Sequence, residues 1–195
     1  MKISKIMKKV LVACEYSQVV TKAFREAGAS AWSCDIIPCE GGHPEWHFQT
    51  DVRRLLHQSW SWDLVIAHPP CTYLARSGAW MLHKNYDRLD EIINAREFFL
   101  QFLELDCPVC VENPYPAKIA DLPHWSQVVC PSEFGHKFTK HTCLWLKDLP
   151  QLLPTHYKNI YAEQWLRHCS HSGKRRAHFW SGIAEAMAAQ WLPLI

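Results

Sequence analysis

The sequence lacks the features that mark a membrane or exported protein. No stretch approaches the roughly 20 consecutive apolar residues of a membrane-spanning helix, so we expect no membrane partner. Residues 1–9 are basic but are not followed by a signal-peptide core with a cleavage site. The net charge is only +2, which excludes a strong overall attraction to nucleic acid and requires a local patch for any DNA partner. We therefore predict a cytoplasmic protein.

The cysteines also lack a disulfide pattern, because there are nine of them, an odd number, at scattered spacings. We expect reduced thiols. A structural zinc would need four converging ligands. The candidate ligands are Cys107, Cys110, Cys130, His136, His141 and Cys143. Since Cys110 falls inside a strand-like run and the later spacing is irregular, we predict no metal site.

What is present is an ordinary globular composition, with 48% apolar and 21% charged residues among 195. Apolar runs alternate with amphipathic segments, which is typical of a parallel sheet covered by helices. The runs predict strands at 10–13, 31–37, 63–67, 109–111 and 142–146, and helices at 19–27, 51–57, 89–103 and 183–191. The predicted fold class is α/β, a Rossmann-like, mainly parallel sheet flanked by helices. We expect one small domain over residues 1–195, with an irregular segment at 147–180 rich in Pro, His and basic residues.

In open α/β sheets, ligands bind beyond the carboxyl ends of the strands. Cys71 lies at such an end and directly follows Pro69 and Pro70, whose rings stiffen the backbone. A thiol presented there suits a nucleophile, although a single cysteine is more often a small buried apolar residue. A low thiol pKa would require help from a cation or a helix end.

Glu112 and Asn113 end another strand-like run and precede Pro114. A carboxyl group at this edge can act as a general acid or bind the edge of a ring. The alternative is a helix N-terminal cap. Together, Cys71 and Glu112 suit addition to an electron-poor ring, with the thiolate bonding to a carbon and a proton passing to a ring nitrogen.

The chain resembles the DNA (cytosine-5) methyltransferases, in particular short phage and prophage members with a minimal target-recognition region. The run from Asp63 to Thr72, with Pro70 and Cys71, resembles the nucleophile motif of that family, and residues 111–113 resemble its Glu-Asn-Val motif. The similarity covers most of residues 9–191 in motif order. It implies the class I fold of methyltransferases that use S-adenosylmethionine, and a location in the host cytoplasm for a phage-encoded protein.

The resemblance implies roles for the catalytic candidates. Cys71 would add to C6 of the pyrimidine, Glu112 would protonate N3, and C5 would take the methyl group before its proton and Cys71 are released. Asn113 would position the nucleophile loop, in which Pro70 precedes the thiol. Lys140 lies where the family has a motif near the base and phosphate.

The resemblance also implies S-adenosylmethionine as cofactor. Asp35 would bind its ribose, and Asp51 would meet the adenine edge. The alternative for either aspartate is a cap or a turn. The further residues expected at the cofactor are Cys14, Glu15, Tyr16, Ser17, His68, Pro69, Ser181 and Gly182.

The substrate remains open at this point. Lys174, Arg175 and Arg176 form a basic patch that could neutralise phosphate or simply be a solvated loop. Only a short segment stands in place of a target-recognition region, while reading a flipped base needs protein surface on both sides of the nucleotide. The chain could act as a homodimer or with a partner, read little sequence, or act on single-stranded DNA or a free pyrimidine nucleotide. The loop at 13–19 has no glycine, which leaves a non-catalytic binder or inhibitor as a further alternative.

Overall fold

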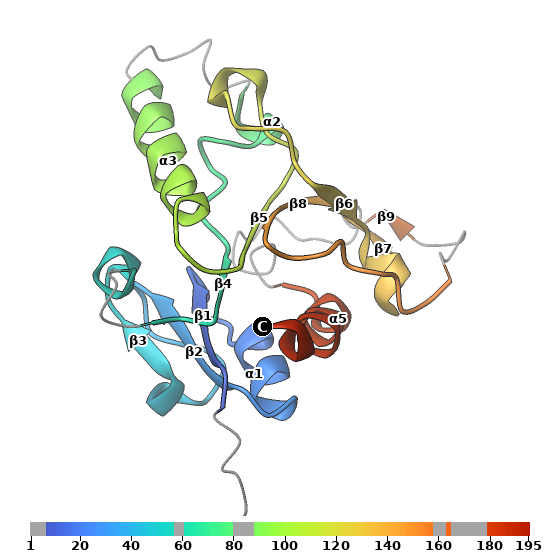
Figure 1. Cartoon of the computed structure of the whole chain (residues 1–195). Helices are drawn as coiled ribbons and strands as arrows, with labels where there is room; N and C mark the ends of the chain where they lie inside the picture. The colour runs from blue at the N-terminus through green and yellow to red at the C-terminus, as the bar shows by residue number, and fades with distance from the viewer. Residues whose placement is uncertain (1–6, 57–60, 80–87, 158–162, 165–178) are drawn as a thin grey trace, which may run out of the picture.

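A seven-stranded sheet forms the centre of the computed structural model, which describes residues 7–56, 61–79, 88–157, 163–164 and 179–195. The strand order is β3-β2-β1-β4-β5-β8-β6 (Figure 1). The five strands from β3 to β5 pair in parallel, and β8 runs antiparallel to both of its neighbours. The strands are β1 (Lys9–Ala13), β2 (Ser30–Asp35), β3 (His47–Gln49), β4 (Leu64–Ala67), β5 (Val109–Asn113), β6 (Gln127–Val129) and β8 (Thr142–Lys147). The predicted Rossmann-like, mainly parallel sheet is confirmed.

Helices cover both faces of this sheet. The α-helices are α1 (Val19–Glu26), α2 (Arg76–Ala79), α3 (Arg88–Leu103) and α5 (Ser181–Trp191). The 3₁₀ turns are η1 (Pro44–Trp46), η2 (Val52–Leu55), η5 (Lys118–Ala120), η6 (Pro131–Phe134) and η8 (Leu192–Leu194). A separate two-residue parallel pair joins β7 (Phe138–Thr139) to β9 (Glu163–Gln164).

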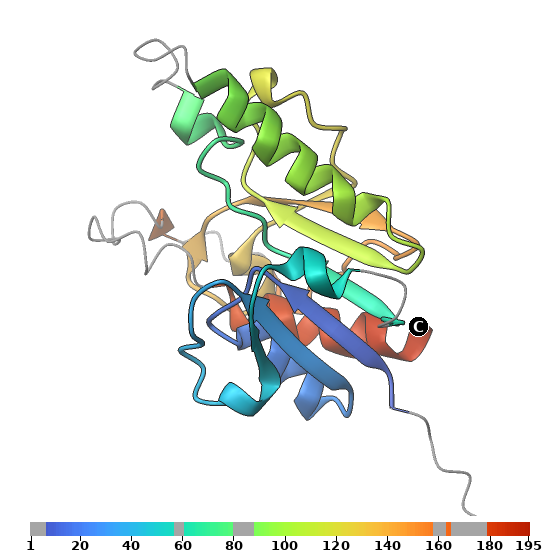
Figure 2. The ribbon, with the colours of Figure 1, turned by 90° about the vertical axis from the view of Figure 1, so that its left-hand side faces the viewer.

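The alternation of side chains along β1 sorts the core into two layers. Val10 and Val12 pack with α1 and α5 on one face, whereas Leu11 and Ala13 pack with α3 on the other. Figures 1 and 2 show α3 and α5 on opposite sides of the strands. All four residues of β4 are fully buried, as expected for a central parallel strand that is covered on both faces.

The predicted elements differ from the observed ones mainly at their ends. The second strand stops at Asp35, and the following Ile36 and Ile37 are 74% and 42% exposed. The segment predicted as a helix at 51–57 is the 3₁₀ turn η2, in which Asp51 caps the N-terminus by accepting from the Arg53 N–H. Most of the irregular segment at 147–180 lies outside the described residues.

The described residues contain no membrane-spanning helix, disulfide or group of metal ligands. None of the described helices is both long and apolar enough to span a bilayer. The eight cysteines in the described part form no disulfide. Within the same ranges, no three His, Cys, Asp or Glu side chains gather in a way that could hold a metal ion.

Candidate active site

The register of β4 and β5 brings two chemically active side chains together. Ala67 pairs with Val111, so that the next residues, His68 and Glu112, lie side by side at the carboxyl ends of the strands. Both follow the alternation that faces α1 and α5, because Ile66 and Cys110 belong to that core layer. His68 Nδ1 and Glu112 Oε2 are 3.1 Å apart.

A pocket of about 250 Å³ opens at this edge of the sheet. It collects residues from six separate stretches of the chain, and ten of them were predicted site residues. Its lining comprises Cys14, Tyr16, Asp35, His68, Pro69, Pro70, Cys71, Glu112, Asn113, Pro114, Lys140, Thr142, Phe179 and Trp180. The predicted catalytic residues therefore share one concave site, which is the usual form of a small-molecule or base-binding site.

Cys71 is exposed and lies on a loop that is tied to the neighbouring strand. Its carbonyl accepts a hydrogen bond from the N–H of Ala75, at 2.9 Å, which turns the chain immediately after the thiol. Further along, the N–H of Ala117 donates to Leu74 O at 2.7 Å, and the N–H of Arg76 donates to Tyr115 O at 3.0 Å. The loop that carries the thiol is thus fixed to the segment that follows Glu112.

Asn113 supplies a further tie. Its Nδ2 donates to Pro69 O at 2.8 Å, and the residue is 1% exposed. Its Oδ1 is buried and has no hydrogen-bond partner among the described residues. Because Pro69 is two residues before Cys71, this bond controls where the thiol stands relative to β5.

The carboxylate of Glu112 is held by two protein donors. Thr142 Oγ1 donates to Oε1, and the His68 ring bonds Oε2. Burial raises the pKa of Glu112, but the His68 and Thr142 hydrogen bonds and the charges of His68 and Lys140 outweigh it, so the net pKa lies below the ordinary value. The side chain remains 17% exposed and reaches the pocket as an ionised acceptor.

A second thiol, that of Cys14, also borders the pocket. Burial, reinforced by the nearby charge of Asp35, holds the pKa of Cys14 far above its ordinary value. Since the thiolate is the reactive form, Cys14 is inert at neutral pH. Cys71 is therefore the candidate nucleophile of this site.

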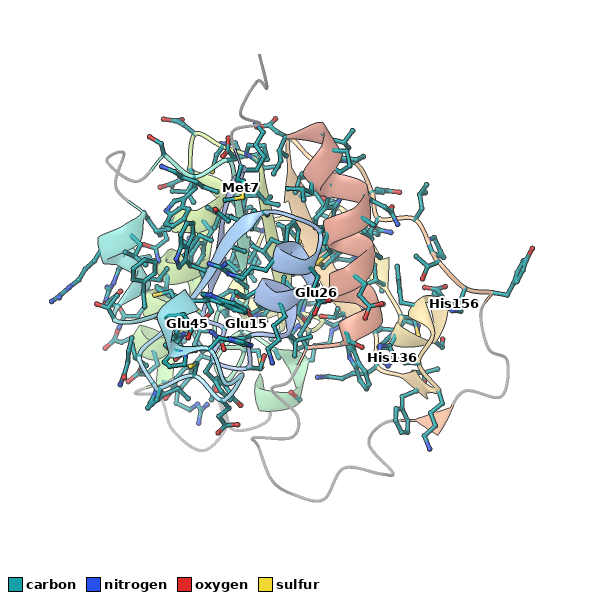
Figure 3. All side chains as sticks on the ribbon, turned by 90° about the horizontal axis from the view of Figure 1, so that it is seen from below. Met7, Glu15, Glu26, Glu45, His136 and His156 are labelled. Carbon is teal, nitrogen blue, oxygen red and sulfur yellow. The ribbon has the colours of Figure 1, made fainter. Side chains whose placement is uncertain are left out.

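The first loop makes its turn without glycine. Cys14 and Gln18 both have φ of 58°, in the left-handed region that favours glycine. Glu15, predicted at the cofactor, instead turns inward and caps α1: its carboxylate accepts from the N–H groups of Val20 and Thr21 at 2.7 and 3.2 Å. Figure 3 labels Glu15 beside α1. Ser17 bonds Glu15 at 3.4 Å, and neither residue lines the pocket, so the structure does not place this pair at a ligand.

A second pocket of about 240 Å³ adjoins the first, since Cys14, Asp35 and Pro70 line both. The second pocket is lined by the apolar side chains of Ile36, Val52 and Phe98 and also by Asp51. An apolar slot with carboxylates at its edge and at its junction with the first pocket fits an adenosine, whose ring needs apolar cover and whose ribose hydroxyls donate to a carboxylate. The Asp51 carboxylate is also bound by Arg53, which lowers the pKa of Asp51.

Ser181 and Gly182, predicted at the cofactor, begin α5 and line neither pocket. A Cβ on Gly182 would stand 1.9 Å from Phe134 O, so glycine is required there for packing of backbone on backbone. The Gly182 N–H donates to His136 Nε2 at 3.0 Å, and Figure 3 shows His136 near this end of α5. The two residues before the helix, Phe179 and Trp180, are the ones that reach the pocket.

Thr142, Phe179 and Trp180 were not foreseen. Thr142 meets Glu112 because Glu112 pairs with Leu144, and Thr142 lies two residues before Leu144 on the same face of β8. Strand register is not readable from the sequence, and two aromatic residues before a helix are an unspecific signal. The predicted basic patch of Lys174, Arg175 and Arg176 lies outside the described residues.

Comparisons with known proteins return a distant structural likeness. No protein-family model and no curated protein matches the chain. Among solved structures, the chain is similar to a mutant of DNMT2 from Spodoptera frugiperda, at 15% identity and a TM-score of 0.43. The match covers 78% of this chain and 54% of that one, so the chain spans about half its length. The fold class accordingly rests on the strand order and pairing described above.

Proposed function

We propose that this chain is a methyltransferase that uses S-adenosylmethionine and modifies C5 of cytosine in DNA. One observation carries the proposal. An exposed thiol (Cys71) and an ionised carboxylate (Glu112) line the same pocket, beside a second pocket with the features of an adenosine site. The ordered motifs around Cys71 and Glu112 in the sequence support the choice of cytosine.

Residues on both pockets would hold the cofactor. Asp35 stands where the pockets join and would accept from the ribose hydroxyls, while Val52 and Phe98 would cover the adenine. The bound cofactor supplies an electrophilic methyl group to C5. Cys14 and Tyr16 line the first pocket on the side of the β1–α1 loop and would bound the space between cofactor and base.

The protein residues make C5 reactive. The Cys71 thiolate adds to C6, the C5=C6 electron pair shifts toward C4, and the pair of C4=N3 moves to N3, which takes a proton delivered through Glu112. After C5 is methylated, N3 returns its proton to Glu112. Solvent water then takes the C5 proton, the C5–H electron pair restores the C5=C6 bond, and the sulfur leaves with the C6–S electron pair.

The direct test is transfer of labelled methyl from S-adenosylmethionine to three cytosine substrates: duplex DNA, single-stranded DNA and deoxycytidine nucleotides. We expect label in a DNA substrate, and at least a 10⁴-fold loss in Cys71→Ser, because the serine hydroxyl is a far weaker nucleophile. Cys39→Ser, which changes a cysteine that lines neither pocket, is the matched control and should retain the wild-type rate.

The other outcomes separate the alternatives. If only the deoxycytidine nucleotide is labelled, the substrate is a free nucleotide and the proposed Cys71 addition mechanism still holds. If no substrate is labelled and calorimetry detects no binding of S-adenosylhomocysteine, the methyltransferase proposal is wrong. The chain would then be a non-catalytic protein with this fold. That alternative has a specific observation behind it, since the β1–α1 loop has no glycine and Glu15 is committed to capping α1.

A further inference from the structure

His68 differs from the other pocket residues in how its two ring nitrogens are placed. Nδ1 faces the Glu112 carboxylate at 3.1 Å, whereas Nε2 is buried and has no hydrogen-bond partner among the described residues. The side chain is 12% exposed. A buried ring nitrogen left without a partner destabilises the folded state by about 1–3 kcal/mol. A histidine at this position therefore points to a functional role.

The surroundings of His68 fix the proton position on its ring and place an aromatic ring against it. Because Glu112 is an acceptor, a neutral His68 carries its proton on Nδ1, and a second proton on Nε2 would make the pair an ion pair. The ring of Phe179 lies against His68, with centroids 4.7 Å apart and planes at 51°. An aromatic ring at this distance favours a cation over a neutral partner.

The Glu112 carboxylate needs such a partner. Its pKa is held low by the same hydrogen bonds that orient it, so at neutral pH it is ionised and carries no proton of its own to give. Yet addition of a thiolate to cytosine requires a proton at N3. The pair with one added proton is an imidazolium hydrogen-bonded to a carboxylate. Because Nε2 holds the added proton, the proton between Nδ1 and Oε2 can be given up.

From this geometry we infer that His68 and Glu112 work as one proton-sharing pair, in which His68 is a positioning residue that orients Glu112 and resupplies the proton it delivers. The inference rests on the proposed function. As sulfur bonds to C6 and the ring electrons move to N3, the Nδ1 proton of His68 passes to Oε2, and Glu112 passes it on to N3. After methylation, N3 returns this proton to Glu112 and Glu112 returns it to Nδ1, so that the pair ends as it began.

Other titratable groups face the same pocket and could also shape a pH profile. They are Cys14 and Tyr16 on the β1–α1 loop, Asp35 at the end of β2, Cys71 on the β4 exit loop and Lys140 before β8. The Cys71 thiol affects the rate in the opposite sense, since more thiolate forms as the pH rises. A rate that falls on the alkaline side is therefore the signature of the pair losing its proton.

The main experiment is a single-turnover pH profile of wild type and His68→Asn. Asparagine keeps an N–H that can reach Glu112 but cannot take up a second proton. We expect His68→Asn to be about 100-fold slower near neutral pH and to lose the alkaline decline, with little change in the Kd for the DNA. The control is His124→Asn, at an exposed histidine whose Nδ1 bonds the neighbouring Trp125 O. Wild-type rates and an unchanged profile in His68→Asn would overturn the inference and leave the methyltransferase proposal standing.

The inference can also be tested without enzymatic turnover. This second test applies if the His68→Asn variant does not fold or if the wild type transfers no methyl group. Nitrogen NMR of ¹⁵N-histidine-labelled wild type at pH 8 reports which nitrogen of His68 carries the proton. We expect the Nδ1–H form, in contrast to the Nε2–H form that prevails in free imidazole side chains. An Nε2–H ring would contradict the proposed His68–Glu112 pair. An Nδ1–H ring in a protein that transfers no methyl group would support the pair and contradict the proposed function.

Discussion

At the scale of single residues, the site depends on how one carboxylate is held. Glu112 has its two oxygens bound by side chains from the strands on either side, His68 after β4 and Thr142 on β8. A carboxylate held from both sides has little rotational freedom. Its direction toward the pocket is thus set by the sheet.

Thr142→Val tests this arrangement, because valine has nearly the shape of threonine and lacks the donor. A hydrogen bond to a charged group contributes about 1.5–3 kcal/mol. We expect methyl transfer to slow by roughly 10-fold or more and the pKa of Glu112 to rise toward its ordinary value, since one cause of the lowering is removed. Thr142→Ser, which restores the hydroxyl, should recover most of the rate; equal rates in the Val and Ser variants would contradict the account.

Cys14→Gly tests the strained turn of the first loop. The residue adopts φ of 58° and borders both pockets, so glycine would relieve the strain of about 1 kcal/mol and widen the space at the junction. We expect calorimetric binding of S-adenosylhomocysteine to strengthen by a few-fold. Weaker binding would show instead that the Cys14 side chain is a contact that the ligand needs.

Some of the site residues could be predicted from the sequence and others could not. Cys71 and Glu112 could be predicted because each lies just beyond a recognisable apolar run, at the edge where parallel strands place their ligands. Glu15 satisfied the same rule, and the structure uses it as a buried cap for α1. Nothing local separates the two cases. The difference is made by the left-handed turns at Cys14 and Gln18, which direct the chain back toward the helix.

At the scale of elements, the two residues that precede α5 form one wall of the site. Phe179 and Trp180 reach the pocket only because the helix begins where it does. Two features fix that start: the close approach of Gly182 to the backbone of η6, and the bond from the Gly182 N–H to His136.

Gly182→Ala tests the close approach. An added Cβ would overlap Phe134 O at 1.9 Å, and backbone cannot move aside cheaply. We expect the free energy of unfolding to fall by about 3 kcal/mol in chemical denaturation, near the upper range for overpacking. Ser181→Ala, one residue earlier, is the control and should change stability by less than about 0.5 kcal/mol. A stable Gly182→Ala protein with normal pocket binding would contradict the packing described here.

The His136 bond predicts a pH dependence of stability. Burial lowers the pKa of His136 below the ordinary 6.5, assisted by His156 and opposed by Glu185. Between the folded and unfolded values the unfolded chain binds more protons, so stability is complete above about pH 6.5 and declines as the pH falls through the folded value. Protonation of Nε2 also removes the acceptor for the Gly182 N–H.

Thermal unfolding at pH 7.5 and pH 5.5 checks this dependence. We expect the wild type to lose more stability than His136→Gln over the interval, because glutamine does not titrate. An equal loss in both proteins would place the pH sensitivity elsewhere.

At the scale of the whole molecule, the architecture was the most predictable part. Fully apolar runs such as 64–67 favour covered strands, and the alternation of such runs with amphipathic helices predicted the parallel sheet. The pairing of β8 between β5 and β6 could not be read in the same way, because it is set by contacts between segments distant in the sequence. Thr142 was missed for that reason.

The central claim is that Cys71 forms a bond to a cytosine ring held by Glu112, and trapping that bond tests it most directly. A DNA oligonucleotide with 5-fluorocytosine cannot release its C5 substituent as a proton, so after methyl transfer the sulfur stays attached. We predict, by mass spectrometry of the protein incubated with this DNA and S-adenosylmethionine, a covalent adduct that maps to Cys71 and is absent in Cys71→Ser. An adduct at another cysteine, or methylation of ordinary cytosine by Cys71→Ser at the wild-type rate, would contradict it.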